Sequence, residues 1–175
     1  MSSLGDQIFS KITESKDLLS KIVSKVPGFS GYMERQDRRN SDKVLRDMIA
    51  ERFEDQWGRV SDLQREFISA GDIMYLDDLE AAAIKLRTFA DRVRTATRGY
   101  SGFFDAVKVN EEELTRIYQY DAAMLEMADE VSRAIDHVTA SMGTEGVSAA
   151  IRNLKTVAQQ CIDTFNRREE VVLAG

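Results

Sequence analysis

The stretch LRDMIAERFEDQWGRVSDLQREF, residues 45–67, decides the fold class. Its large apolar residues recur at steps of three and four: Leu45, Ile49, Phe53, Trp57, Val60, Leu63 and Phe67. An α-helix has 3.6 residues per turn, so this spacing places them on one face and predicts a helix with one buried side. The same spacing recurs in segments 4–26, 76–93, 114–142 and 147–165. No comparable run alternates with period two, so we expect no β-sheet.

Glycines separate these segments. The apolar stripes stop at four of them: Gly28, Gly71, Gly99 and Gly143. Glycine readily takes the left-handed conformation that ends a helix, and a chain with a single proline allows long helices between such stops. We therefore predict an all-α fold, an antiparallel bundle of about five helices, in which the second helix begins between Tyr32 and Ser41.

An unusual string, Gly-aromatic-Ser-Gly-aromatic, occurs twice, at residues 28–32 and 99–103. The apolar positions before the two strings also correspond in the same register. This favours two helical hairpins, residues 3–70 and 72–142, that descend from one duplicated unit, with a C-terminal helix over 144–172 added. Chance similarity between amphipathic helices is the alternative.

Length and composition bound the function. A chain of 175 residues is expected to form a single domain, residues 1–175, around one hydrophobic core. The net charge of −6 argues against nucleic acid as a partner, because nucleic-acid affinity comes mainly from Lys and Arg side chains that neutralise phosphates. No apolar run approaches the roughly 20 residues that cross a bilayer. A single cysteine and the lack of a leader-like start predict a cytoplasmic protein, with peripheral membrane attachment as an alternative.

The residues that could carry enzymatic chemistry do not combine. A di-metal helical bundle needs Glu-x-x-His motifs, but the only histidine, His137, has Ala134 three residues before it. The adjacent Asp136 points about 100° away on a helix, and Cys161 falls on an apolar stripe, where a thiol behaves as a small hydrophobe. We therefore predict no catalytic residue, no metal site and no cofactor. A site of carboxylates alone remains an alternative, although its candidates are expected to be solvated: Glu126, Asp129 and Glu130.

Asp121 is the most unusual polar position, because it occupies the stripe between Ile117 and Met124. A carboxylate there needs a partner. The sequence predicts a buried polar pair of Asp121 with Arg52, and Arg46 is the other candidate on the same segment. Partial exposure at the edge of the stripe and a ligand pocket are the alternatives.

Alternating helix directions would bring the two Gly-aromatic strings to one end of the bundle. Basic residues expected at that end are Arg35, Arg38, Arg39, Arg94, Arg98 and Lys108, together with Lys25, Arg167 and Arg168. They could dock an acidic partner segment or anionic lipid headgroups, or simply complement helix dipoles. Aromatic residues expected there either plug the bundle or contact a partner: Phe29, Tyr32, Tyr100, Phe103 and Phe104.

The first segment offers a different surface, since apolar residues on one face are surrounded by lysines, as in helices that lie on membranes. Burial of that face within the bundle is the other interpretation. Taken together, the sequence predicts a non-enzymatic helical bundle that acts through protein–protein interaction or self-assembly. A peripheral membrane protein is the first alternative, and a carboxylate metal- or anion-binding bundle is the second.

Overall fold

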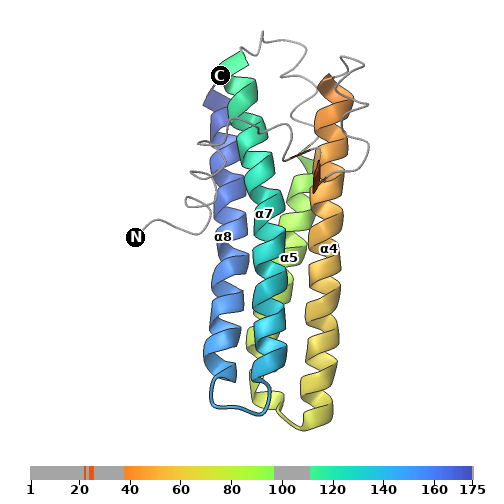
Figure 1. Ribbon diagram of the computed structural model, residues 1–175, viewed down its shortest axis with the longest axis vertical. Helices are drawn as coiled ribbons and strands as arrows, with labels where there is room; N and C mark the ends of the chain where they lie inside the picture. The colour runs from red at the N-terminus through yellow and green to blue at the C-terminus, as the bar shows by residue number, and fades with distance from the viewer. Residues whose placement is uncertain (1–21, 23, 26–37, 97–110, 175) are drawn as a thin grey trace.

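The computed structural model describes residues 22, 24–25, 38–96 and 111–174 (Figure 1). It contains four long helices: α4 (Arg38–Ala70), α5 (Leu76–Thr95), α7 (Glu111–Ser141) and α8 (Val147–Ala174), with a short 3-10 turn, η1 (Ile73–Tyr75). The described residues include no β-strand, and the all-α prediction is confirmed. Most of the first predicted segment lies outside these residues, although its described members, 22, 24 and 25, are helical.

The four helices run antiparallel along one axis (Figure 1). Helices α4 and α5 form one hairpin, α7 and α8 form the other, and the hairpins pack through α4 against α7 and α5 against α8. Each helix thus has two neighbours in a four-sided bundle. Both hairpin turns lie at the same end, which we call the turn end, while α4 begins and α8 ends at the opposite end.

Glycine ends two of the helices, as predicted. Gly71 has φ 82° and directly follows α4, and Gly143 has φ 72° and lies two residues after α7. At the first turn, the amide of Gly71 donates to the Ile68 carbonyl and that of Asp72 to the Phe67 carbonyl, each at 3.0 Å. These bonds satisfy carbonyls that the end of a helix leaves without partners.

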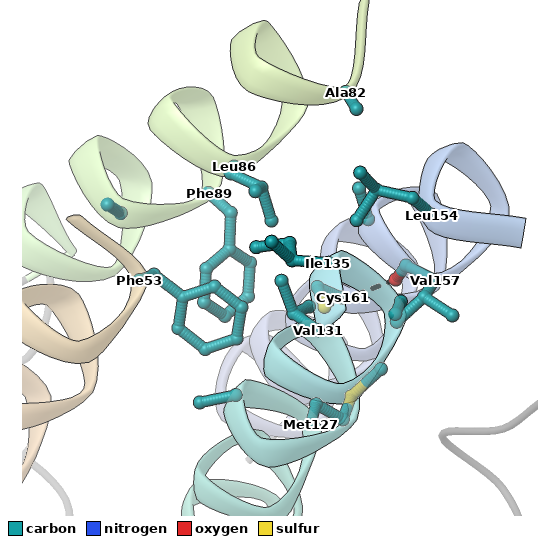
Figure 2. Packing of buried hydrophobic residues seen from close by; sticks show 14 of the residues in the cluster. Phe53, Ala82, Leu86, Phe89, Met127, Val131, Ile135, Leu154, Val157 and Cys161 are labelled. Atoms are coloured by element: carbon teal, nitrogen blue, oxygen red, sulfur yellow. Dashed lines mark hydrogen bonds between the residues drawn. The ribbon is translucent and has the colours of Figure 1, made fainter. Parts of the chain in front are cut away.

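The core is a continuous layer of apolar side chains between the four helices. Figure 2 shows Phe53 of α4, Phe89 of α5, Val131 of α7 and Cys161 of α8 converging on it. Every apolar position of the 45–67 stripe is buried except Trp57, which is half-buried against the core. The aromatic rings of Phe53 and Phe89 lie 4.2 Å apart between centroids.

Two glycines should respond oppositely to the same substitution. Gly58 lies inside α4, and a Cβ added there would meet no atom within 4 Å, so Gly58→Ala is expected to raise the free energy of unfolding by roughly 0.5–1 kcal/mol. A Cβ at Gly71 is equally free of neighbours, but its positive φ strains an alanine, so Gly71→Ala should lower stability by about 1 kcal/mol. Urea denaturation measures both, and changes of the same sign would contradict the assignment.

Candidate functional site

A fully buried ion pair joins α7 to α8. Asp121 and Arg168 both have side-chain exposures of 0%. Arg168 Nε donates to Asp121 Oδ1 at 2.5 Å, and Arg168 Nη2 donates to Asp121 Oδ2 at 3.2 Å. This two-point geometry matches the planar guanidinium to the carboxylate and helps to offset the removal of both charges from water.

The partner of Asp121 differs from the predicted one. Arg52 instead donates from Nη2 to the main-chain oxygen of Lys25 at 2.6 Å and lies 3.9 Å from Asp129. Arg46 is buried on α4. Hairpin geometry explains the choice of Arg168: Asp121 lies 20 residues before the end of α7 at Ser141, and Arg168 lies 21 residues after the start of α8 at Val147. Nearly equal distances from a short turn bring two residues to about the same height.

A signal for Arg168 is present in the sequence but was missed. The buried stripe of α8 includes Ala158, Cys161 and Phe165, and Arg168 continues it with a step of three. The sequence analysis assigned Arg168 to an exposed basic end. That assignment is wrong, because the side chain is enclosed in the core and bound to Asp121.

The other candidates for the basic end have mixed outcomes. Arg94 is partly exposed, and its Nη1 and Nη2 donate to Glu54 at 2.5 and 3.1 Å, which ties α5 to α4. Arg38 and Arg39 belong to α4, but their side chains are not described. Arg167 is exposed on α8, while Arg35, Arg98 and Lys108 lie outside the described residues. The aromatic candidates also lie outside them: Phe29, Tyr32, Tyr100, Phe103 and Phe104.

Polar contacts of the same kind fasten the other helix seams. Lys155 binds Asp78 at 2.6 Å between α8 and α5, and Arg92 binds Glu169 at 3.1 Å across the same seam. Between α4 and α7, Arg59 pairs with Asp136 and donates to Ser132 at 2.7 Å. Partly exposed ion pairs are individually weak, so these contacts mainly define how the helices fit together.

The carboxylates considered for a metal site are bound to cations of the chain. Lys25 Nζ lies 2.9 Å from Glu126 and 2.6 Å from Asp129, while Glu130 pairs with Arg133. Burial alone would lower the pKa of Lys25, but its hydrogen bonds to Asp129 and Glu126 outweigh burial and raise that pKa. Within the described ranges, no three or more His, Cys, Asp or Glu side chains cluster as metal ligands would.

Cys161 lies in the core, as its position on the stripe predicted. Its Sγ donates to the Val157 carbonyl at 3.2 Å, and burial raises the pKa of the thiol far above its usual value. The thiolate is the nucleophilic form of cysteine, so burial disfavours the reactive form of Cys161.

The most distinctive surface is apolar and lies mainly at the turn end. Four large apolar side chains are exposed in the part of the chain that the structure describes: Ile68 (55%), Ile73 (67%), Met74 (77%) and Ile84 (55%). We call them the hairpin patch. Ile68 is in the last turn of α4, Ile73 and Met74 are in η1, and Ile84 lies further along α5.

Two cross-helix contacts place Ile68 and Ile84 on the same outer seam. Gln64 of α4 donates to Glu80 of α5 at 2.9 Å, and the guanidinium of Arg87 on α5 lies 5.4 Å from the centre of the Trp57 ring on α4. Ile68 follows Gln64 by four residues, and Ile84 follows Glu80 by four, so each shares a helix face with its contact residue. Ile68 lies toward the turn and Ile84 away from it, with the hydrogen-bonded Gln64–Glu80 pair between them on the outer seam of α4 and α5.

The second hairpin turn provides a contrast. Between α7 and α8, the Thr144 hydroxyl donates to the Ser141 carbonyl at 2.7 Å and accepts from the Gly146 amide at 3.2 Å. Exposed residues of this turn are small or polar, with Glu145 the only charged one among residues 142–147. The exposed apolar side chains are thus specific to the first hairpin and are not a requirement of the turn.

The surroundings of the hairpin patch are acidic. Residues 62–80 contain six acidic side chains and one basic side chain, Arg65. Arg65 pairs with Asp62 at 3.1 Å, so the local cation is already engaged. Glu66 and Asp77 are exposed on either side of the turn. Sequence reasoning missed this surface because it followed the buried stripes, whereas Ile73, Met74 and Ile84 lie off them.

Comparison with known proteins found no match: no family model, curated protein or solved structure matches this chain. Among the described helices, none is both long and apolar enough to span a membrane. The functional assignment therefore depends on the geometry of the bundle and its surface.

Proposed function

We propose that this protein is a non-enzymatic helical bundle that acts through protein–protein interaction, with the α4–α5 hairpin as its contact surface. The observation that carries the proposal is the hairpin patch, with Ile73 and Met74 the most exposed of its members. Burial of apolar surface stabilises a protein or a complex by about 25 cal/mol per Å², and apolar surface left in water does not gain this free energy. An apolar surface next to polar groups on an otherwise well-packed protein is typical of an interaction site.

The rest of the described bundle supports a binding role over an enzymatic one. Its buried ion pair links two helices inside the core, its thiol is enclosed, and its carboxylates near Lys25 are engaged with cations. The charged pair, the thiol and these carboxylates thus stabilise the bundle, although they are the types of group that could otherwise serve in catalysis or metal binding. What remains exposed at the hairpin is suited to contact with another macromolecule.

We further propose that the first segment, residues 3–26, is the fifth helix and packs on the bundle. Ile22 is helical and fully buried, and Lys25 binds Glu126 and Asp129 of α7. Arg52 of α4 also donates to the Lys25 carbonyl. A helix over residues 3–26 held at Ile22 and Lys25 would direct its apolar face to the core, which favours a protein partner over a membrane surface.

Amide hydrogen exchange tests the fifth helix. Residues 8–22 should be protected in the free protein to an extent comparable with α4, because exchange from a packed helix requires its opening. Protection that arises only when anionic vesicles are added would favour the membrane alternative and would contradict the proposal.

Affinity capture of the full chain from native cells, followed by mass spectrometry, tests the proposed function. We expect a stoichiometric protein partner that survives washing. Light scattering at known concentrations shows whether that partner is a second copy, while vesicle flotation and metal analysis test the membrane and metal alternatives. Flotation with vesicles, or stoichiometric metal in a protein that captures no partner and stays monomeric, would overturn the proposal.

A further inference from the structure

We infer that the hairpin patch docks a basic amphipathic α-helix of a partner protein. The inference rests on the proposed function, because it names the chemistry of the partner for the same surface. Two properties of the hairpin carry it: the exposed apolar side chains spaced along the seam between α4 and α5, and the excess of acidic side chains around them.

The seam has the dimensions of a short helix. Its apolar members Ile68 and Ile84 lie on either side of the hydrogen-bonded Gln64–Glu80 pair, and the exposed Arg87 beside Trp57 stands at its far end. From the start of α5 at Leu76 to Arg87 the helix rises about 16 Å, since each residue adds about 1.5 Å. That length corresponds to about three turns of a docked helix, whose apolar residues at i, i+3, i+4 and i+7 would contact the seam.

The charge around the seam selects the partner. Glu66 and Asp77 flank the turn and are exposed, and Asp72 lies between them. Lysine or arginine side chains on the edges of a docked helix would lie close to these carboxylates, which speeds encounter and orients the helix. Arg65, the one basic side chain among residues 62–80, pairs with Asp62, and Lys155 of α8 pairs with Asp78, so the six carboxylates of this stretch exceed these two cations by four.

The same charge argues against two other occupants. Face-to-face packing of two copies through this patch would bring the acidic residues of both hairpins together, and like charges in contact weaken an interface. Anionic lipid headgroups would be repelled in the same way, since membrane surfaces attract basic segments. A basic protein helix is therefore the occupant that satisfies both the apolar seam and its acidic border.

The test uses the full chain and a synthetic amphipathic peptide of about 14 residues, with leucines at i, i+3, i+4 and i+7 and lysines elsewhere. Fluorescence anisotropy should detect binding that weakens as salt is added. A peptide with glutamate in place of lysine should bind at least about tenfold more weakly. The double variant Ile73→Ser/Met74→Ser should lose roughly tenfold in affinity for the lysine peptide, because the two most exposed apolar contacts are removed.

A pair of charge variants separates local from diffuse attraction. Glu66→Gln/Asp77→Asn removes two exposed acids at the hairpin, and Glu51→Gln/Asp55→Asn removes two exposed acids further along α4. The hairpin pair should weaken peptide binding by about threefold or more, and the distant pair by less than about twofold. Circular dichroism should be unchanged in all three variants, since every altered side chain is exposed.

Several results would overturn the inference. One is that the Ile73→Ser/Met74→Ser variant binds the lysine peptide as tightly as wild type does. Another is that the two charge variants lose the same affinity, and a third is that wild type binds the glutamate peptide as tightly as the lysine peptide. Dimerisation or vesicle binding that the Ser variant abolishes would assign the patch to a second copy or to a membrane instead. A native partner captured equally by wild type and Ser variant would contradict this inference and the choice of the hairpin as contact surface, and would leave a protein–protein interaction through another surface. Capture of no partner by wild type would contradict the proposed function itself.

Discussion

Replacing Asp121 by alanine should lower the free energy of unfolding by about 3–5 kcal/mol, the largest effect expected of any single polar substitution in the described bundle. The carboxylate receives two hydrogen bonds from Arg168, and both side chains are fully enclosed. Its removal leaves the guanidinium charged in the core without this anion. Urea denaturation monitored by circular dichroism measures the change.

The double substitution Asp121→Leu/Arg168→Met is the control for this prediction. An apolar pair of similar volume avoids both the desolvation of two charges and the buried cation, so stability should return to near the wild-type value or exceed it. A loss below about 1 kcal/mol for Asp121→Ala would show that the pair is not a buried ion pair in solution. Equal losses in the single and double variants would instead assign the effect to packing.

Phe89→Ala should have a comparable effect, with a loss of about 3–5 kcal/mol in the free energy of unfolding. The ring of Phe89 is 1% exposed, and its centroid lies 4.2 Å from that of Phe53 and 6.1 Å from that of Phe165. Truncation therefore removes apolar burial and two aromatic contacts together, and it leaves a cavity where α5 meets α4 and α8.

The matched control is Ile84→Ala on the same helix. Ile84 is 55% exposed and belongs to the hairpin patch, so its truncation should change stability by less than about 0.5 kcal/mol. Thermal and urea denaturation of both variants make the comparison. Similar losses for Phe89→Ala and Ile84→Ala would contradict the assignment of Phe89 to the core and of Ile84 to the surface.

Periodicity predicted the all-α fold because a helix face repeats every 3.6 residues and burial follows that face. The 45–67 stripe became the core side of α4, and Gly71 and Gly143 became left-handed residues after helix ends. Both features are local: each depends on a few neighbouring residues and on the backbone preferences of glycine. The expectation of a fifth helix concerns a segment mostly outside the described residues and stays a prediction.

The partner of Asp121 was less accessible from sequence. Its position on the stripe marked it as a carboxylate in need of a partner, but which cation reaches it depends on which helices are neighbours and at what height. Counting residues from the α7–α8 turn indicates Arg168, whereas the stripe pattern alone points to Arg52, which lies on or beside another stripe. Which residues face each other across a helical hairpin can be read from the sequence only if the turn is placed to within one or two residues; otherwise the tertiary structure is needed.

The hairpin patch was missed for a related reason. Isolated apolar residues off a stripe are common on protein surfaces and carry no signal individually. Only the packing of α4 against α5 brought Ile84 and Ile68 to one seam and left Ile73 and Met74 exposed beside it. Their acidic border, by contrast, is visible in residues 62–80 of the sequence.

The sequence by itself determined the helices, their buried faces and two of the glycine turns, because each is specified by spacing along a single segment and by local backbone preferences. The tertiary structure decided that Asp121 pairs with Arg168, that Arg94 binds Glu54, and that the apolar residues outside the stripes gather on one hairpin. These features depend on the relative height and rotation of helices far apart in the chain. Small shifts in either would leave the apolar pattern intact and change every one of these contacts.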